Sequence, residues 1–134
     1  MAEHPNVARV RAAYAAFEKS DLNGALADIA VDAVFHFTGE GPNSGDHKGR
    51  DAIEAALIAN FELTGGTQKL DIHSIFADDQ HAVISLRETA TRTDGATLDL
   101  EEAHILSIDS EGKITDLWDV SVDPQGHDRF FDGR

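Results

Sequence analysis

Apolar residues recur at three- and four-residue steps in three segments of the first half of the chain, a spacing that places them on one face of a helix. These residues are Val7, Val10, Tyr14 and Phe17, then Leu22, Ala25, Leu26 and Ile29, and finally Ile53, Ala56, Leu57 and Phe61. Pro5 suits the first turn of a helix, and Gly65-Gly66 suits the end of one. The pattern predicts helices over residues 5–19, 22–29 and 51–64.

The other apolar residues follow patterns that are typical of β-strands. The aromatic and β-branched run Ala33–Thr38 predicts a first strand, and Gly39–His47 predicts a loop after it. Alternating patterns predict four more strands, over residues 70–77, 81–92, 96–109 and 113–122, joined by short turns. We therefore expect an α+β fold, in which a curved antiparallel sheet is wrapped on three N-terminal helices in one domain over residues 1–134.

The turn lengths predict which residues lie opposite one another in the sheet. A two-residue turn at Asp94-Gly95 would set Arg87 opposite Glu102, and the next turn would set Glu102 opposite Asp119. One face then carries a polar row, which consists of Ser85, Arg87, Thr89, Glu102, His104 and Asp119. The other face is mainly apolar and carries Ile84, Leu86, Ile105, Trp118 and Val120. Either the polar row is exposed and the apolar face is the core, or the polar row lines a concavity and a second subunit covers the apolar face.

The charge and composition of the chain narrow the classes of partner. With 11 Lys and Arg against 25 Asp and Glu, the formal net charge is −14, so the field of the protein repels phosphate backbones and anionic lipid surfaces. We therefore expect neither nucleic acid nor a membrane as a partner. The chain has no cysteine, which excludes disulfides, thiolate metal sites and a cysteine nucleophile.

The two ends of the chain carry little predicted structure. Residues 1–6 have neither the cationic start nor the apolar run of a secretory signal, and no segment approaches a membrane span, so we expect a cytoplasmic protein. Asp123-Pro124 would close the last strand. His127, Phe130 and Phe131 follow in a short tail that we expect to lie over an opening of the core.

Three stretches of the sequence carry a family resemblance: Tyr14–Leu26, Gly45–Ile53 and Glu111–Asp119. They resemble the SnoaL-like branch of the nuclear transport factor 2-like superfamily, which also holds ketosteroid isomerases, limonene epoxide hydrolases and scytalone dehydratases. The resemblance implies a cone-shaped scaffold, a small-molecule pocket between the concave face of the sheet and the helices, and a homodimer formed through the outer face that carries Trp118. It favours the polar row as the lining of the pocket, and it leaves the activity open because this scaffold hosts unrelated chemistries.

Single positions match these relatives to different degrees. The general base of the isomerases falls at Phe37, whose phenyl ring cannot accept a proton, and their carboxylic oxyanion donor falls at His104, which can donate a hydrogen bond. Asp119 falls where the epoxide hydrolases keep a pocket aspartate. The resemblance therefore implies acid–base chemistry other than steroid isomerisation.

The polar row supplies the candidate catalytic residues. His104 and Asp119 are the predicted acid–base groups, and Glu102 would orient His104. The predicted ligand-binding residues are Tyr14, Phe37, Arg87, Leu106 and Leu117. The alternative is a structural role, in which these polar groups satisfy one another in the core. We expect no metal and no cofactor, because Glu102, His104 and Asp119 have no recognisable ligand spacing.

Two functions follow from these residues. The first is a cofactor-free isomerase, cyclase or hydrolase that acts by acid–base catalysis on a small apolar cyclic or polyketide-like molecule. The second is a non-catalytic ligand-binding or accessory dimeric protein, which is favoured by Phe37 standing where a base is expected.

Overall fold

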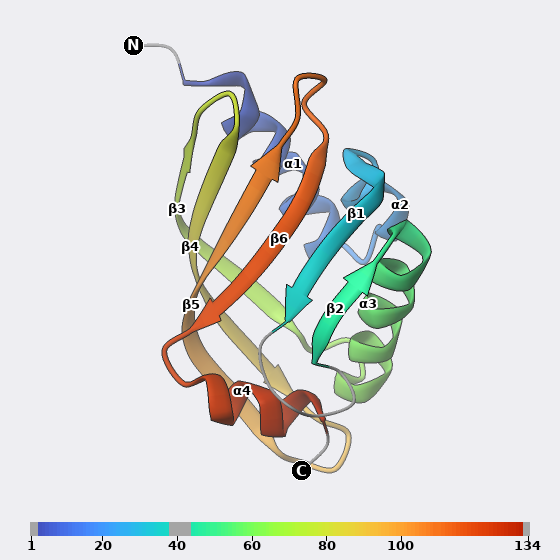
Figure 1. The fold of residues 1–134 in the computed structure, drawn as a ribbon. Coiled ribbons are helices and arrows are strands. Elements are labelled where there is room, and N and C mark those ends of the chain that lie inside the picture. Colours follow the sequence, from blue (N-terminus) through green and yellow to red (C-terminus); the bar gives the residue numbers. More distant parts are fainter. Residues whose placement is uncertain (1–2, 38–43, 133–134) are drawn as a thin grey trace.

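The computed structural model describes residues 3–37 and 44–132, which form four helices and one six-stranded sheet (Figure 1). The helices are Pro5–Glu18 (α1), Leu22–Leu26 (α2), Arg50–Thr64 (α3) and Pro124–Phe131 (α4). The strands are Ile29–Phe37 (β1), Gly45–Lys48 (β2), Lys69–Ala77 (β3), His81–Thr91 (β4), Thr97–Ile108 (β5) and Ile114–Ser121 (β6). The predicted α+β class is confirmed, and α4 is a helix where the sequence predicted a short tail.

Local contacts set the ends of the helices. At the start of α1, Nδ1 of His4 accepts a hydrogen bond from the backbone N–H of Asn6 at 3.1 Å. Helix α3 ends at Gly65, whose φ of 58° lies in the left-handed region that glycine adopts without strain. Asp123 caps α4, because its Oδ1 accepts a hydrogen bond from the backbone N–H of Gly126 at 3.0 Å. The Asp123 cap favours a helix start at Pro124, with two residues between the last strand and the helix.

The strands follow the order β2-β1-β6-β5-β4-β3 in the sheet. Strands β1 and β6 are parallel and the other neighbouring pairs are antiparallel, so the expectation of a fully antiparallel sheet is wrong for this pair. No short turn joins β1 to β6, and a long connection through α3 and β3–β5 leaves either direction open. Strand β2 falls in the predicted loop, whose residues 39–43 lie outside the described residues.

The hairpin between β4 and β5 has a longer turn than the sequence predicted. The backbone N–H of Arg92 donates to the carbonyl of Ala96 at 2.7 Å, and Gly95 between them has a left-handed φ of 96°. Three residues therefore form the turn, and Leu86 lies opposite Glu102. Because side chains alternate across a strand, this one-residue difference places every β4 side chain on the face opposite to the predicted one.

The inner face of the sheet, which the helices cover, therefore differs from the prediction in β4. The β4 side chains on this face are Ile84, Leu86 and Glu88. Arg87 lies on the opposite, outer face, where its Nε donates to Oδ1 of Asp99 at 2.7 Å. The β5–β6 pairing is shifted by two residues from the prediction, so its faces stay as expected, and Asp119 lies opposite His104.

Helices α1, α2 and α3 pack on one side of the sheet, and α4 lies across one end of it (Figure 1). The main core between these layers includes Val10, Leu26, Phe35, Ile53, Ile84, Leu86, Leu106 and Leu117. A smaller cluster of Ala90, Leu98, Phe130 and Phe131 holds α4 against the sheet. None of the helices in the described part of the chain has the length and apolar character needed to cross a membrane.

Candidate active site

A cavity of about 110 Å³ lies between the inner face of the sheet and the helices. Most of its wall is apolar; the apolar lining includes Phe17, Leu26, Phe37, Leu57, Leu106 and Leu117. The polar side chains gather toward α4 and form a group that we call the polar cluster, which consists of Glu88, Glu102, His104, Asp119 and His127. An apolar cavity with a few convergent polar groups is the usual form of a small-molecule site.

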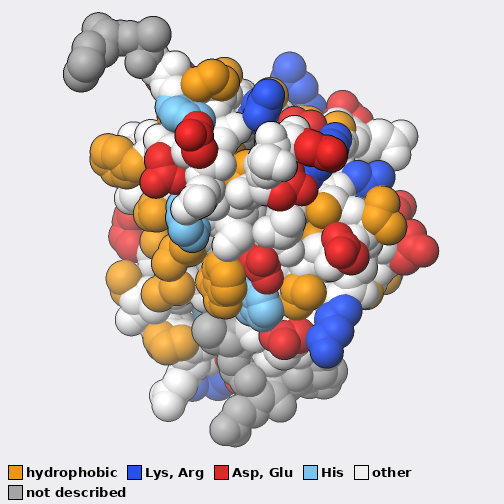
Figure 2. Space-filling view, turned by 45° about the horizontal axis from the view of Figure 1, so that its top comes forward, with side chains coloured by type: hydrophobic (Ala, Val, Ile, Leu, Met, Phe, Trp, Pro, Cys, Tyr) orange, Lys and Arg blue, Asp and Glu red, His pale blue; other side chains and the backbone are white. Residues whose placement is uncertain are grey.

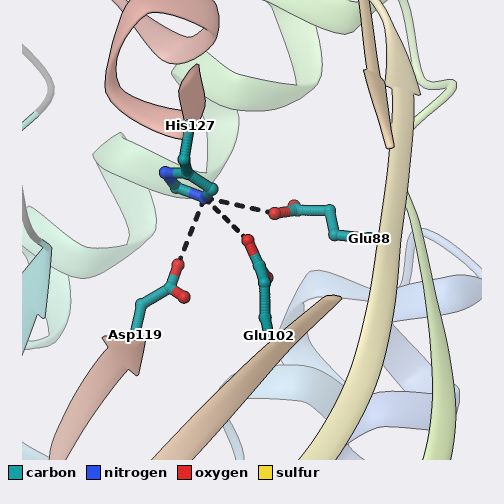
Figure 3. A group of neighbouring side chains, drawn as sticks. All are labelled: Glu88, Glu102, Asp119 and His127. Carbon is teal, nitrogen blue, oxygen red and sulfur yellow. Dashed lines mark hydrogen bonds and ion pairs between the residues drawn. The ribbon is translucent and has the colours of Figure 1, made fainter. Parts of the chain in front are cut away.

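His127 occupies the centre of the polar cluster, between three carboxylates (Figure 3). Its Nε2 lies 3.1 Å from Oε1 of Glu102, 3.2 Å from Oε1 of Glu88 and 3.3 Å from Oδ2 of Asp119. Each carboxylate comes from a different strand, β4, β5 or β6, and His127 comes from α4. Since Nε2 carries at most one hydrogen, the three acceptors share a single donor.

Tyr14 and His104 form a second contact at the polar end of the cavity. The hydroxyl of Tyr14, on α1, lies 2.6 Å from Nδ1 of His104. On the other side of the ring, Nε2 lies 3.7 Å from Oε2 of Glu102 and 3.7 Å from Oδ1 of Asp119. The imidazole therefore connects two carboxylates with a hydroxyl group that lines the cavity.

The two buried glutamates differ in their affinity for protons. Burial raises the pKa of Glu88 to about 7. Burial acts in the same direction on Glu102, but the adjacent His104 and His127 outweigh it and lower the pKa of Glu102 to about 2. Glu88 therefore keeps its proton up to about pH 7, whereas Glu102 is ionised throughout the physiological range.

The neighbouring carboxylates raise the pKa values of both imidazoles. Burial opposes their charging, but Asp119 and the two glutamates outweigh burial and raise the pKa of His127 to about 12. Burial likewise opposes the charging of His104, and Glu102 and Asp119 nevertheless raise its pKa. Burial and the same carboxylates raise the pKa of the Tyr14 hydroxyl, which stays protonated. The imidazolium of His127 offsets part of the charge of the carboxylates, and the raised pKa of His104 favours a second positive charge beside them.

Four members of the polar cluster could also hold a metal ion. Ligand atoms of Glu88, Glu102, Asp119 and His127 all lie within 4.8 Å of one another. Imidazole and carboxylate ligands suit Zn²⁺ or Mn²⁺. A metal ion would have to displace the proton of His127, because only a neutral imidazole binds a metal. Protons and a metal ion are therefore competing ways to satisfy the same carboxylates.

The structure brings most of the predicted site residues together around the cavity. Those that line it are Tyr14, Phe37, His104, Leu106, Leu117 and Asp119. Glu102 lies behind this wall with its side chain 0% exposed, in contact with both His104 and His127. Arg87 lies on the outer face, where it pairs with Asp99, and it does not line the cavity, so its predicted position in the polar row is wrong. The β4–β5 turn is the physical reason for this difference.

Glu88 and His127 are members of the site that the sequence analysis missed. The predicted two-residue turn puts Glu88 on the face opposite the polar row, because Glu88 alternates with Arg87 along β4. His127 was predicted to lie in a tail, although Pro124 suits a helix start and His127, Phe130 and Phe131 have the spacing of one helical face. The helical pattern was therefore present in the sequence, whereas the face of Glu88 depended on the turn.

Solved structures resemble the whole described fold. Bal32a, from a soil-derived mobile gene cassette, is 31% identical, with a TM-score of 0.87 over 94% of this chain and 95% of that chain. TerC, co-crystallized with polyporic acid, is 23% identical, with a TM-score of 0.80 over 92% of this chain and 95% of that chain. A nuclear transport factor 2-like protein from Burkholderia pseudomallei is 21% identical, with a TM-score of 0.76 over 94% and 96% of the two chains.

The comparisons confirm the fold family that the sequence resembled. A search of curated proteins finds no match. The family model of the SnoaL-like domain matches residues 10–117, which run from within α1 to the middle of β6. This chain belongs to the SnoaL-like family, with the nuclear transport factor 2-like fold.

Proposed function

We propose that the chain binds a small, largely apolar cyclic or polyketide-like molecule in the cavity and transfers a proton on it without a cofactor. The proposal rests on one observation: Asp119 and Tyr14 both lie beside His104 at the polar end of an apolar cavity. The apolar wall keeps water away, which strengthens charge interactions at that end. The crystallization of TerC with polyporic acid shows that this fold is compatible with a small organic ligand.

Asp119 is the base in this proposal. Its carboxylate accepts a proton from a carbon next to a carbonyl group, and the electron pair of the C–H bond forms a carbon–carbon double bond while the carbonyl pair moves onto oxygen. Tyr14 donates a hydrogen bond to that oxygen, and Nδ1–H of His104 donates to the Tyr14 oxygen. Glu102 raises the pKa of His104 and so favours its charged form. Return of the proton from Asp119 to the same or another carbon gives exchange or isomerisation.

The test is hydrogen–deuterium exchange on bound ring compounds. Cyclic ketones and aromatic polyketides that raise the melting temperature of the protein would be incubated with it in D₂O, and exchange next to the carbonyl would be followed by NMR. We expect exchange that His104→Ala or Asp119→Asn slows by about a hundredfold or more. His73→Ala, which removes an exposed histidine on the outer face, is the matched control and should leave the rate unchanged. Equal rates in all variants would contradict the proposal.

A non-catalytic ligand-binding protein is the second candidate. Phe37 lines the cavity at the position of the isomerases' base and cannot accept a proton, which favours this reading. The two candidates differ in one outcome of the same experiment. Ligands that bind and are recovered without exchange would support binding without chemistry.

We also propose a homodimer, formed through the outer face of the sheet. Exposed hydrophobic side chains on this face are Phe76, Val83, Trp118 and Val120. Hydrophobic side chains gather in patches beside acidic groups on the surface (Figure 2), a pattern that is typical of subunit interfaces. Sedimentation of the wild type as a dimer, and of Val120→Glu as a monomer, is the expected result. Ile58→Glu, on α3, is the control and should remain dimeric; a monomeric wild type would contradict the proposal.

A further inference from the structure

A second hollow of about 370 Å³ lies next to the cavity, and we call it the outer groove. It runs between the end of α1, the start of α2 and the second half of α3, and its lining includes Phe17, Leu57, Ile58, Phe61 and Gln68. Ile58 is 42% exposed and Phe61 is 50% exposed. The outer groove therefore presents two large apolar side chains to solvent.

The outer groove adjoins the cavity and shares part of its lining with it. Phe17, Leu57 and Gln68 line both hollows, so a wall one side chain thick separates them. Gln68 is the polar part of this wall, and its side-chain amide donates a hydrogen bond to Glu88 of the polar cluster. A molecule that reaches the polar cluster from the outer groove would pass these three side chains.

The sizes of the two hollows limit the ligand. An engineered apolar cavity of about 150 Å³ in another protein holds one benzene molecule. A cavity of about 110 Å³ therefore admits no more than a single ring. A larger ligand must extend out of it, and the outer groove offers more than three times the volume and an apolar floor.

We infer that the ligand is an elongated molecule with a single polar ring at the polar cluster and a neutral apolar extension in the outer groove. This inference rests on the proposed function and names the class of ligand. Glu18 and Glu62 lie at the rim of the outer groove and are exposed. Together with the net charge of −14, they disfavour an extension that ends in a carboxylate, so fatty acids are poor ligands.

The inference is tested with phenol, 4-butylphenol and 4-octylphenol, each kept below its aggregation limit, in calorimetric titrations. Burying one methylene group strengthens binding about fourfold. We therefore expect 4-butylphenol to bind at least about tenfold more tightly than phenol, with a further gain for 4-octylphenol. An octylphenol that carries a terminal carboxylate should bind more weakly than 4-octylphenol itself.

Variants test whether the gain in affinity from the alkyl chain arises in the outer groove. Ile58→Ser and Phe61→Ser change residues that line only the outer groove, and they should reduce the gain from the alkyl chain while leaving the affinity for phenol unchanged. Val122→Ser removes an exposed apolar side chain outside both hollows and should change neither quantity. An alkyl gain that survives in both serine variants would overturn the inference.

The outcomes also separate this inference from the proposed function. Equal affinities for the three phenols would overturn the elongated ligand and leave the ring site in place. Weaker binding of all three phenols to His104→Ala, with the ratio of their affinities retained, would support both the ring site and the outer groove. No binding of any of the phenols would overturn both.

Discussion

Replacing Glu88 by Gln tests whether this carboxyl group is buried in its protonated form. Burial raises the pKa of Glu88 from 4.5 to about 7. In the unfolded chain the group loses its proton near pH 4.5, while in the folded chain it keeps the proton up to about pH 7. The folded state therefore binds more protons between these values, and the free energy of unfolding falls as pH rises through this window.

The size of the effect follows from the same values. At about 1.4 kcal/mol per pKa unit, ionising the buried group costs about 3 kcal/mol of stability above pH 7. Glu88→Gln keeps the shape and the hydrogen-bonding capacity of the side chain but cannot ionise. Relative to the wild type, the variant should therefore gain about 3 kcal/mol between pH 4.5 and pH 8.

Urea denaturation at half-unit steps from pH 4.5 to 8.5 would measure this difference. The matched control is Glu101→Gln, which changes an exposed glutamate on the outer face of the neighbouring strand. Its stability should run parallel to that of the wild type over the whole range. If the stability curve of Glu88→Gln also ran parallel to that of the wild type, Glu88 would not be a buried, protonated group. That result would contradict the position of Glu88 on the inner face of the sheet.

Three further substitutions test other parts of the site. Arg87→Ala removes an exposed ion pair with Asp99, so urea denaturation and ligand titration should show almost no change, and a large loss of ligand affinity would refute the outer position of Arg87. Tyr14→Phe leaves Nδ1 of His104 without its partner, so it should cost about 1–3 kcal/mol in unfolding and slow exchange in D₂O about a hundredfold. Leu106→Ala, at a side chain that is 0% exposed, should cost about 2–5 kcal/mol, and a loss below about 1 kcal/mol would contradict its place in the core.

The sequence determined the elements and the composition of most of the site. Helical spacing, strand alternation and glycine or proline at the ends are local properties, and they located α1, α3 and the four strands of the meander to within a few residues. The faces of β5 and β6 were also correct: His104 and Asp119 face the cavity with Leu106 and Leu117. A two-residue error in their pairing leaves the faces unchanged, because side chains alternate with a period of two.

Only the tertiary structure decided which face of β4 lines the site. The difference between a two-residue and a three-residue turn at Gly95 exchanged Arg87 for Glu88 on the inner face. The local sequence fits either turn, whereas packing selects the one that buries Ile84 and Leu86 under the helices.

The polar cluster itself is a product of the tertiary structure. Its carboxylates come from three strands and its central imidazole from a helix after the sheet, so no local spacing marks them as one group. The protonation of Glu88 and the charge of His127 arise from their mutual distance and burial, which exist only in the folded chain. The sequence thus determined which chemical groups were available, and folding decided which of them share the cavity.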